Sequence, residues 1–324
     1  MTNTLQLPQQ QTNFRSNRIQ IILLFVAVFT LSLAAILIKL SEQYIGPNAT
    51  IFNRFWIATF ILGLWKGVKS LTSRLSQDTS KVQESYTIYD ILLLVLTAIL
   101  ISLSQLSWAW SITQTSVANA NLLHNMTPIF TILGGWLLFN YSFNNKFLMG
   151  VALAIGGAIT ISIQDLQIST DQLNGDSLAL LSAIFFGANN LVVEKLRVKF
   201  STISILLWSC FFRIFLTFPV VIFTEDKIFP SSLQGWLPVI CLAIFCQVIG
   251  SGILFYSLKY FSSGFVSLFL LLEPIIATIL AWVIFGEDLS LLNGLAFIVV
   301  LVGIYVAKSG QESDNPMKNV TEDI

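Results

Sequence analysis

The sequence predicts an all-α membrane protein in which ten transmembrane helices form two inverted five-helix repeats. Three observations predict this fold: a low content of charge, ten apolar segments of spanning length and a weak internal repeat. The 324 residues are 55% hydrophobic and only 10% charged, with a mean hydropathy of +0.78, whereas soluble domains are about 25% charged. This deficit indicates that lipid surrounds most of the chain. The formal net charge of zero gives no indication of a nucleic-acid partner.

Ten segments are apolar enough to cross a bilayer, which takes about 20 mostly apolar residues per helix. We place them at residues 19–40, 47–68, 89–111, 116–139, 146–164, 175–193, 203–223, 236–258, 263–285 and 290–307. The first segment is too long for the apolar part of a signal peptide and lacks a small-residue cleavage site, so we expect it to be retained. The polar ends, 1–18 and 308–324, are expected to be cytoplasmic tails.

The basic residues predict this orientation. With ten spans and the N-terminus inside, only Lys39 and Lys227 fall on the outer side. Thirteen fall on the cytoplasmic side: Arg15, Arg18, Lys66, Lys69, Arg74, Lys81, Lys146, Lys195, Arg197, Lys199, Lys259, Lys308 and Lys318. This asymmetry follows the positive-inside rule, and a wrong number of spans would scramble it. We therefore expect a multi-pass protein of the plasma or inner membrane.

The two halves of the chain resemble each other when the second is shifted by 146 residues. The shift aligns Ser111, Ser116, Leu122, Pro128, Ile129, Trp136 and Phe139 with Ser257, Ser262, Leu268, Pro274, Ile275, Trp282 and Phe285. Each half, residues 19–164 and 175–307, contains five helices, so the second must enter the membrane upside down. Inverted repeats are typical of secondary transporters, with the solute site near the middle of the membrane. Two repeats make a complete unit, so a monomer or a homodimer is expected.

Short motifs in the second half carry a family resemblance. They are residues 256–264 (YSLKYFSSG), Glu273-Pro274, Phe285-Gly286-Glu287, Asn293-Gly294 and Gly303. With the five-plus-five helices, they resemble the EamA-type family of the drug/metabolite transporter superfamily over residues 20–307. In the first half, residues 139–142 (FNYS) stand where a Gly-Glu turn is commoner. The resemblance implies a permease that works by alternating access, often an exporter of amino acids or other metabolites, with helices 3, 4, 8 and 9 lining its cavity.

The fourth predicted helix has the most polar face. Asn121, His124 and Asn125 lie at i, i+3 and i+4, one turn before Pro128. A proline leaves the carbonyl of residue 124 without its helical N–H partner and kinks the helix, and Pro274 is expected to do the same in the ninth helix. The amide face is expected to line a solute cavity, unless its asparagines form hydrogen bonds between helices. The other candidate solute-binding residues are Gln105, Trp108, Gln247 and Tyr256.

Two ionisable residues are candidates for proton coupling. Glu273 is a carboxylate in the middle of a predicted span, where it must be protonated, paired or hydrated. It can carry the proton, bind a cationic group or have a structural role at the Pro274 kink. His124 is the only histidine and titrates near neutral pH, although a lone histidine in a helix is usually a packing residue.

Arg54 and Arg213 occupy related positions in the second and seventh helices. Such arginines can bind an anionic group of a solute, join the two repeats through ion pairs or extend toward the membrane surface. The sequence leaves these three roles open.

The chain contains no ATP-binding loop, no metal-ligand spacing and no nucleophile motif. We therefore expect no cofactor, no metal and no enzyme activity. The leading hypothesis is a secondary permease for small organic metabolites, an exporter of amino acids or related neutral or zwitterionic solutes. An exchanger of phosphorylated or nucleotide-linked metabolites is the nearest alternative, and a membrane enzyme acting on lipid, a receptor or a channel are more distant ones.

Overall fold

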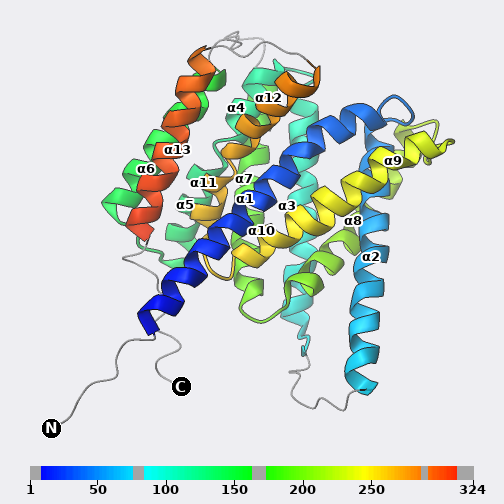
Figure 1. Ribbon diagram of the computed structural model, residues 1–324. Coiled ribbons are helices and arrows are strands. Elements are labelled where there is room, and N and C mark those ends of the chain that lie inside the picture. The colour runs from blue at the N-terminus through cyan, green and yellow to red at the C-terminus, as the bar shows by residue number, and fades with distance from the viewer. Residues whose placement is uncertain (1–8, 76–83, 163–172, 286–290, 312–324) are drawn as a thin grey trace.

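The protein is a bundle of helices. The computed structural model describes residues 9–75, 84–162, 173–285 and 291–311, and every regular element in these ranges is helical (Figure 1). The first half contains α1 (Gln9–Ser41), α2 (Pro47–Leu75), α3 (Ile88–Ser111), α4 (Val117–His124), α5 (Thr127–Phe139) and α6 (Asn145–Ser162). The second contains α7 (Leu173–Arg197), α8 (Thr202–Thr224), α9 (Leu233–Cys241), the π-helical η3 (Leu242–Gly250), α10 (Ser251–Ser257), α11 (Ser263–Phe269), α12 (Leu272–Phe285) and α13 (Leu291–Gln311).

Seven helical stretches in the described ranges are long and apolar enough to cross a membrane. They are Ile19–Ser41, Ile88–Ser111, Asn119–Phe139, Leu173–Arg197, Thr202–Thr224, Leu233–Ser257 and Ser263–Ile284. Shorter apolar helices cover Asn145–Thr160 and Gly294–Gly310. α2 is long enough, but it carries Arg54, Lys66 and Lys69. The all-helical membrane fold is thus confirmed, whereas the count of ten spans stays a prediction.

The distribution of side chains is that of a protein in lipid. Large apolar side chains are exposed on the outside of the bundle, among them Trp65, Leu137, Phe215, Phe223 and Tyr305. Polar side chains are buried inside it, among them Asn53, Arg54, Asn190, Arg213 and Gln247. Since a polar group costs free energy in hydrocarbon, the buried polar residues mark the part of the bundle where a specific role is expected.

The helices pack mostly in pairs, each with one member from either half of the chain. α2 packs against α8, α3 against α7, α6 against α13, and α1 against η3 and α10. Small residues allow the closest of these approaches: a Cβ atom at Gly157 of α6 would lie 2.7 Å from Cγ2 of Val300 in α13. Such approaches are how helices associate in lipid, where no hydrophobic force drives them together.

Two helical spans are interrupted shortly before a proline. α4 ends at His124 and α5 begins at Thr127, directly before Pro128. The Thr127 hydroxyl donates a hydrogen bond of 2.6 Å to the carbonyl of His124, the group that Pro128 cannot serve. Likewise α11 ends at Phe269 and α12 begins at Leu272, two residues before Pro274.

Candidate functional site

Two arginines lie in the interior of the bundle, where α2 packs against α8. Arg54 of α2 is 9% exposed and Arg213 of α8 is 4% exposed. Arg213 donates a hydrogen bond of 2.5 Å from Nη2 to Oε1 of Gln105 in α3, and its guanidinium lies 3.6 Å from the centre of the Phe55 ring. This arginine therefore has both a polar partner and an aromatic face to pack on.

Arg54 has no such partners. Within the described ranges, its guanidinium forms neither a hydrogen bond nor an ion pair. The Nε atoms of both arginines are buried without an acceptor, so the two differ in the contacts of the rest of the guanidinium. Its ionisable neighbours are Glu273, Cys210 and Cys246. A buried cation without a partner is costly, so Arg54 is the least compensated charge in this part of the bundle.

Glu273 lies in the first turn of α12 and is half-buried. Its backbone carbonyl accepts a hydrogen bond of 3.1 Å from the Ser32 hydroxyl of α1, which fixes the start of α12 against α1. In the described part of the chain its carboxylate is not engaged in an ion pair. Arg54 and Glu273 are thus opposite charges on different helices, close enough to interact but too far apart to pair.

The predicted amides fall into two groups. Gln105 and Gln247 lie beside Arg213, since Gln105 accepts its hydrogen bond and Gln247 Nε2 donates to Sγ of Cys210 on the same helix, at 3.4 Å. Trp108 and Asn121 form a second group, in which the indole Nε1 donates a hydrogen bond of 3.1 Å to Asn121 Oδ1 and joins α3 to α4.

The side chains of three further candidates have other surroundings. Asn125 is the C-cap residue of α4, at the break before α5. His124 forms a 2.7 Å hydrogen bond between Nδ1 and the Ser182 hydroxyl of α7 and packs near Phe186, an arrangement that joins two helices. The Tyr256 hydroxyl hydrogen-bonds that of Tyr260, at 3.0 Å, toward one end of the bundle.

This end, which we call the basic end, carries Lys66, Lys69, Lys195, Lys199 and Lys259. It contains a cavity of about 740 Å³ between α2, the start of α8, η3 and α10. The cavity is lined by Lys69, Arg197, Lys199 and Lys259, by Trp65 and Tyr256, and by a floor that includes Leu62 and Leu206. We call it the basic cavity.

Two buried leucines separate the basic cavity from the arginines. Leu62 is 4% and Leu206 is 1% exposed. Arg54 precedes Leu62 by eight residues and Arg213 follows Leu206 by seven, which places both arginines roughly 10–12 Å deeper along their helices. Beyond them, a small cavity of about 50 Å³ is lined by Asn48 and Gln105. The arginines thus lie between two cavities.

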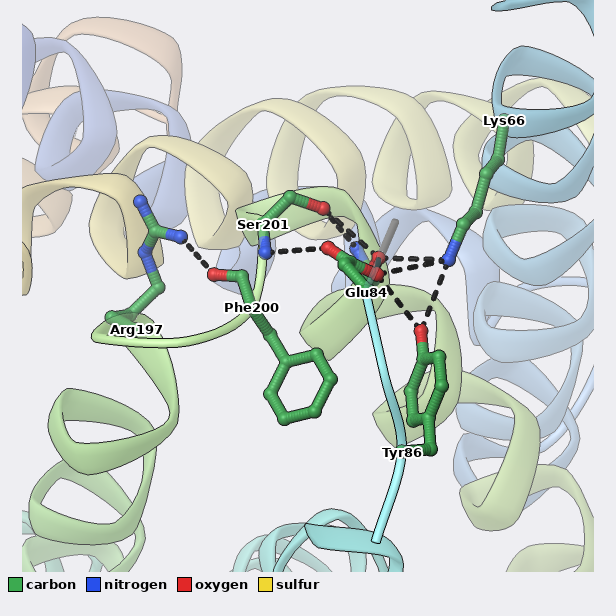
Figure 2. A network of polar contacts seen from close by, with 7 residues as sticks. Lys66, Glu84, Tyr86, Arg197, Phe200 and Ser201 are labelled. Atoms are coloured by element: carbon green, nitrogen blue, oxygen red, sulfur yellow. Dashed lines mark hydrogen bonds and ion pairs between the residues drawn. The ribbon is translucent and has the colours of Figure 1, made fainter. Parts of the chain in front are cut away.

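A network of polar contacts holds the basic end together (Figure 2). The Glu84 carboxylate accepts hydrogen bonds from the backbone N–H of Ser201 (2.8 Å), the Ser204 hydroxyl (2.5 Å) and the Tyr86 hydroxyl (2.9 Å). Lys66 of α2 lies 3.5 Å from the same carboxylate. Since Lys66 belongs to α2 and Ser201 is the N-cap of α8, this carboxylate joins the two helices.

Arg197 completes this network. Its Nη1 atom donates to the carbonyl of Phe200 (Figure 2). Its Nε atom donates to the carbonyl of Phe255 in α10, at 3.0 Å. It therefore fixes the turn between α7 and α8 against α10.

The opposite end of the α2–α8 pair has a matching contact. Glu225 follows α8, and its Oε1 atom accepts a hydrogen bond of 3.0 Å from the backbone N–H of Asn48 in the first turn of α2. Sequence patterns did not single out Glu84 or Glu225. The available signal was their equivalent position, in the connection after the second helix of each half.

We expect the Glu84 network to make stability fall in acid. Burial opposes ionisation of Glu84, but the hydrogen bonds from Ser204, Ser201 and Tyr86 outweigh it and lower the pKa of the carboxyl to about 2, from 4.5. A lowered pKa in the folded state stabilises the protein above the unfolded pKa, and this stabilisation is lost as the pH falls from about 5 to about 2. Because solvent screens this site, we expect a loss of about 1 kcal/mol.

Thermal unfolding between pH 7 and pH 3 measures this loss. In Glu84→Gln the loss of stability between pH 7 and pH 3 should be smaller by about this amount. Glu42→Gln, which changes an exposed acid at the end of α1, should behave as the unchanged protein. Identical pH profiles for all three proteins would contradict the role of Glu84.

Comparisons with known proteins agree with the helical membrane fold. The model of the EamA-like transporter family matches residues 18–163 and 173–308. A solved crystal structure covers 90% of this chain and 98% of its own, with a TM-score of 0.74 and 15% sequence identity.

Named relatives are all transporters. An S-adenosylmethionine uptake transporter of Rickettsia prowazekii is 28% identical over 225 residues, which are 68% of this chain and 72% of the relative. A probable amino-acid metabolite efflux pump of Salmonella typhimurium is 24% identical over 196 residues, 58% of this chain and 66% of the relative. An uncharacterized transporter of Methanothermobacter thermautotrophicus is 25% identical over 67% of this chain, and the match spans 64% of its own length.

Proposed function

Because the chain belongs to the EamA-like transporter family, we propose that it is a secondary transporter that exports amino acids or related neutral or zwitterionic metabolites. The observation that carries this proposal is the polar interior of a bundle with an apolar surface: Arg54, Arg213, Gln105 and Gln247 are all withdrawn from lipid. Polar residues at this depth usually belong to a solute or ion pathway. A relative named as a probable amino-acid metabolite efflux pump supports the solute class and the direction.

We propose ten spans in two inverted repeats, residues 19–164 and 175–307. The packing supports this division. The first helix of each half contacts the third helix of the other half: α1 contacts η3 and α10, and α7 contacts α3. The second helices of the two halves, α2 and α8, contact each other. The two carboxylate caps support it as well. Glu84 binds the start of α8 at one end of the pair and Glu225 binds the start of α2 at the other, as two inverted copies require.

The Glu225 cap yields a prediction. A Cβ atom at Gly46 would overlap the Glu225 carboxylate, so Gly46→Ala should displace that carboxylate from α2 and cost about 1 kcal/mol, the usual loss for a helix cap. Thermal unfolding measures the loss. Glu225→Gln should cost a similar amount, and the double variant should cost no more than either single one. Additive losses would mean that Gly46 and Glu225 act independently.

We propose that the basic end and both chain termini face the cytoplasm of the plasma or inner membrane. The accumulation of lysines at this end supports that orientation. α1 begins and α13 ends at the same end of the bundle (Figure 1). The basic cavity is then the inner entrance of the pathway, and its cations disfavour a solute with net positive charge.

Transport in this proposal works by alternating access. In the described conformation, Leu62 and Leu206 separate the basic cavity from the arginines. Rocking of one repeat against the other would separate these leucines and open the pathway to the basic cavity, while the pathway closes on the other side of the arginines. The breaks before Pro128 and Pro274 provide places where two spans can bend.

We propose that proton movement through Glu273 drives export. The charged or ionisable groups that interact with this carboxylate are Arg54 of α2 and Cys246 of η3. His124 is the weaker candidate, because its imidazole is hydrogen-bonded to the neutral Ser182 hydroxyl.

The test is gradient-driven flux in proteoliposomes. Purified protein is reconstituted, and uptake of labelled amino acids and of sugar phosphates is measured with and without a pH gradient. Saturable, gradient-sensitive flux of amino acids supports the proposal. Flux of sugar phosphates alone supports the exchanger of phosphorylated metabolites, an alternative that the two buried arginines and the basic cavity favour.

A further inference from the structure

The two buried arginines differ in one respect that suggests a ligand. They occupy facing helices and are buried to a similar degree. Arg213 donates from Nη2 to Gln105 and stacks on the Phe55 ring, although its Nε atom lacks an acceptor. Arg54 lacks any hydrogen-bond acceptor among the described residues, although its guanidinium can donate up to five hydrogen bonds. A planar guanidinium with free donors matches the geometry of a carboxylate.

The nearby acid does not supply this partner. Glu273 interacts electrostatically with Arg54, but the two form no ion pair. Different neighbours hold the two backbones: the start of α12 is tied to α1 through the Ser32 hydroxyl, whereas Arg54 belongs to α2, which packs against α8 and η3. The fold therefore keeps a cation and an anion near each other and unpaired. A ligand that carries both charges on neighbouring atoms would compensate both.

We propose that Arg54 and Glu273 form a two-point site for the ammonium and carboxylate groups of an α-amino acid. Arg54 binds the carboxylate through two N–H donors, and Glu273 accepts hydrogen bonds from the ammonium group. The occupied site is neutral overall, because four charges are arranged as two opposite pairs. This inference rests on the proposed transport function and names the part of the solute that is recognised.

Binding to the purified protein in detergent tests the two-point site without a transport assay. The probes are L-phenylalanine and L-leucine, each with two analogues: the amine without the carboxylate (phenethylamine, isoamylamine) and the acid without the amine (3-phenylpropionate, 4-methylpentanoate). For each compound the dissociation constant is measured from the ligand-induced rise in Tm. An amino acid should bind about tenfold or more tightly than either analogue, as expected for loss of one charge-assisted contact.

The variants identify which residue binds which charged group of the amino acid. Arg54→Gln should remove the preference for the amino acid over the amine, and Glu273→Gln should remove the preference over the acid. Arg213→Gln separates the two arginines. It should lower stability through loss of the Gln105 and Phe55 contacts and keep both preferences, because its guanidinium is already engaged by the protein. Elution from size exclusion as a single species shows that each variant is folded.

Three results would overturn the two-point site. They are equal binding of all three kinds of compound by the unchanged protein, an Arg213→Gln variant that loses the same preference as Arg54→Gln, and binding of none of the compounds. Flux measurements separate this failure from failure of the proposed function. Gradient-driven flux that does not depend on the amino-acid group would contradict the two-point site but not the transport function. Absence of any flux with folded protein would contradict the transport function as well.

Discussion

Glu273→Gln is expected to abolish the response of transport to a pH gradient while the protein remains folded and inserted. Glutamine keeps the size and shape of the side chain but replaces one oxygen with an NH2 group and cannot bind and release a proton. The carboxylate is half-buried at the start of α12, without an ion-pair partner in the described part of the chain, and faces the ionisable groups of Arg54 and Cys246. The proteoliposome assay, run from pH 5 to pH 8 on either side, measures the response.

Two variants complete this experiment. Glu42→Gln changes an exposed acid at the end of α1 and should keep the pH response of the unchanged protein. His124→Gln should keep it too, because the imidazole is placed as a hydrogen-bonding group beside Ser182. An unaltered pH response in Glu273→Gln would show that Glu273 does not couple transport to protons. Loss of the pH response in His124→Gln would assign this role to the histidine.

Gly157→Leu is expected to destabilise the bundle strongly. Gly157 lets α6 approach α13, and a Cβ atom there would lie 2.7 Å from Val300 Cγ2, 2.9 Å from Val300 N and 3.0 Å from Ala296 O. The last two atoms belong to the backbone, so the helices must separate to admit a side chain. Overpacking of this kind costs about 1–3 kcal/mol, and we expect a value at the upper end.

The neighbouring glycine provides the control for this prediction. A Cβ atom at Gly156 meets nothing within 4 Å, so Gly156→Leu adds a side chain without a clash. Thermal unfolding of both variants in the same detergent should show a large loss for Gly157→Leu and little change for Gly156→Leu. Equal losses would mean that helix propensity or detergent, rather than the α6–α13 contact, determines the effect.

Much of the fold could be predicted because long apolar segments identify membrane helices in a sequence. Charge depletion and the apolar segments predicted a helical membrane protein, and the motifs around residues 256–264 and Glu273-Pro274 predicted the EamA-like family, which the match over both halves confirms. The break between α4 and α5 could also be predicted, because Pro128 has no backbone N–H to donate to the His124 carbonyl.

The site was harder to predict. Helical periodicity indicates which residues share a face of a helix, but not which residues of other helices pack against that face. Asn121 shares a face with His124 and Asn125, yet it pairs with Trp108, whereas His124 pairs with Ser182. Arg213 differs from Arg54 because it contacts Gln105 of α3 and the Phe55 ring of α2, whereas Arg54 has no such partner in the described ranges. Such contacts follow from tertiary packing alone.

Solute counterflow is the most direct test of transport by alternating access. Proteoliposomes are loaded with unlabelled L-leucine or L-phenylalanine and diluted into a trace of the labelled compound, with no pH gradient. A carrier that alternates its single site exchanges one molecule for another, so the label should rise above its equilibrium level inside and then decline. Entry that approaches equilibrium without this overshoot would indicate a channel-like pathway and contradict alternating access.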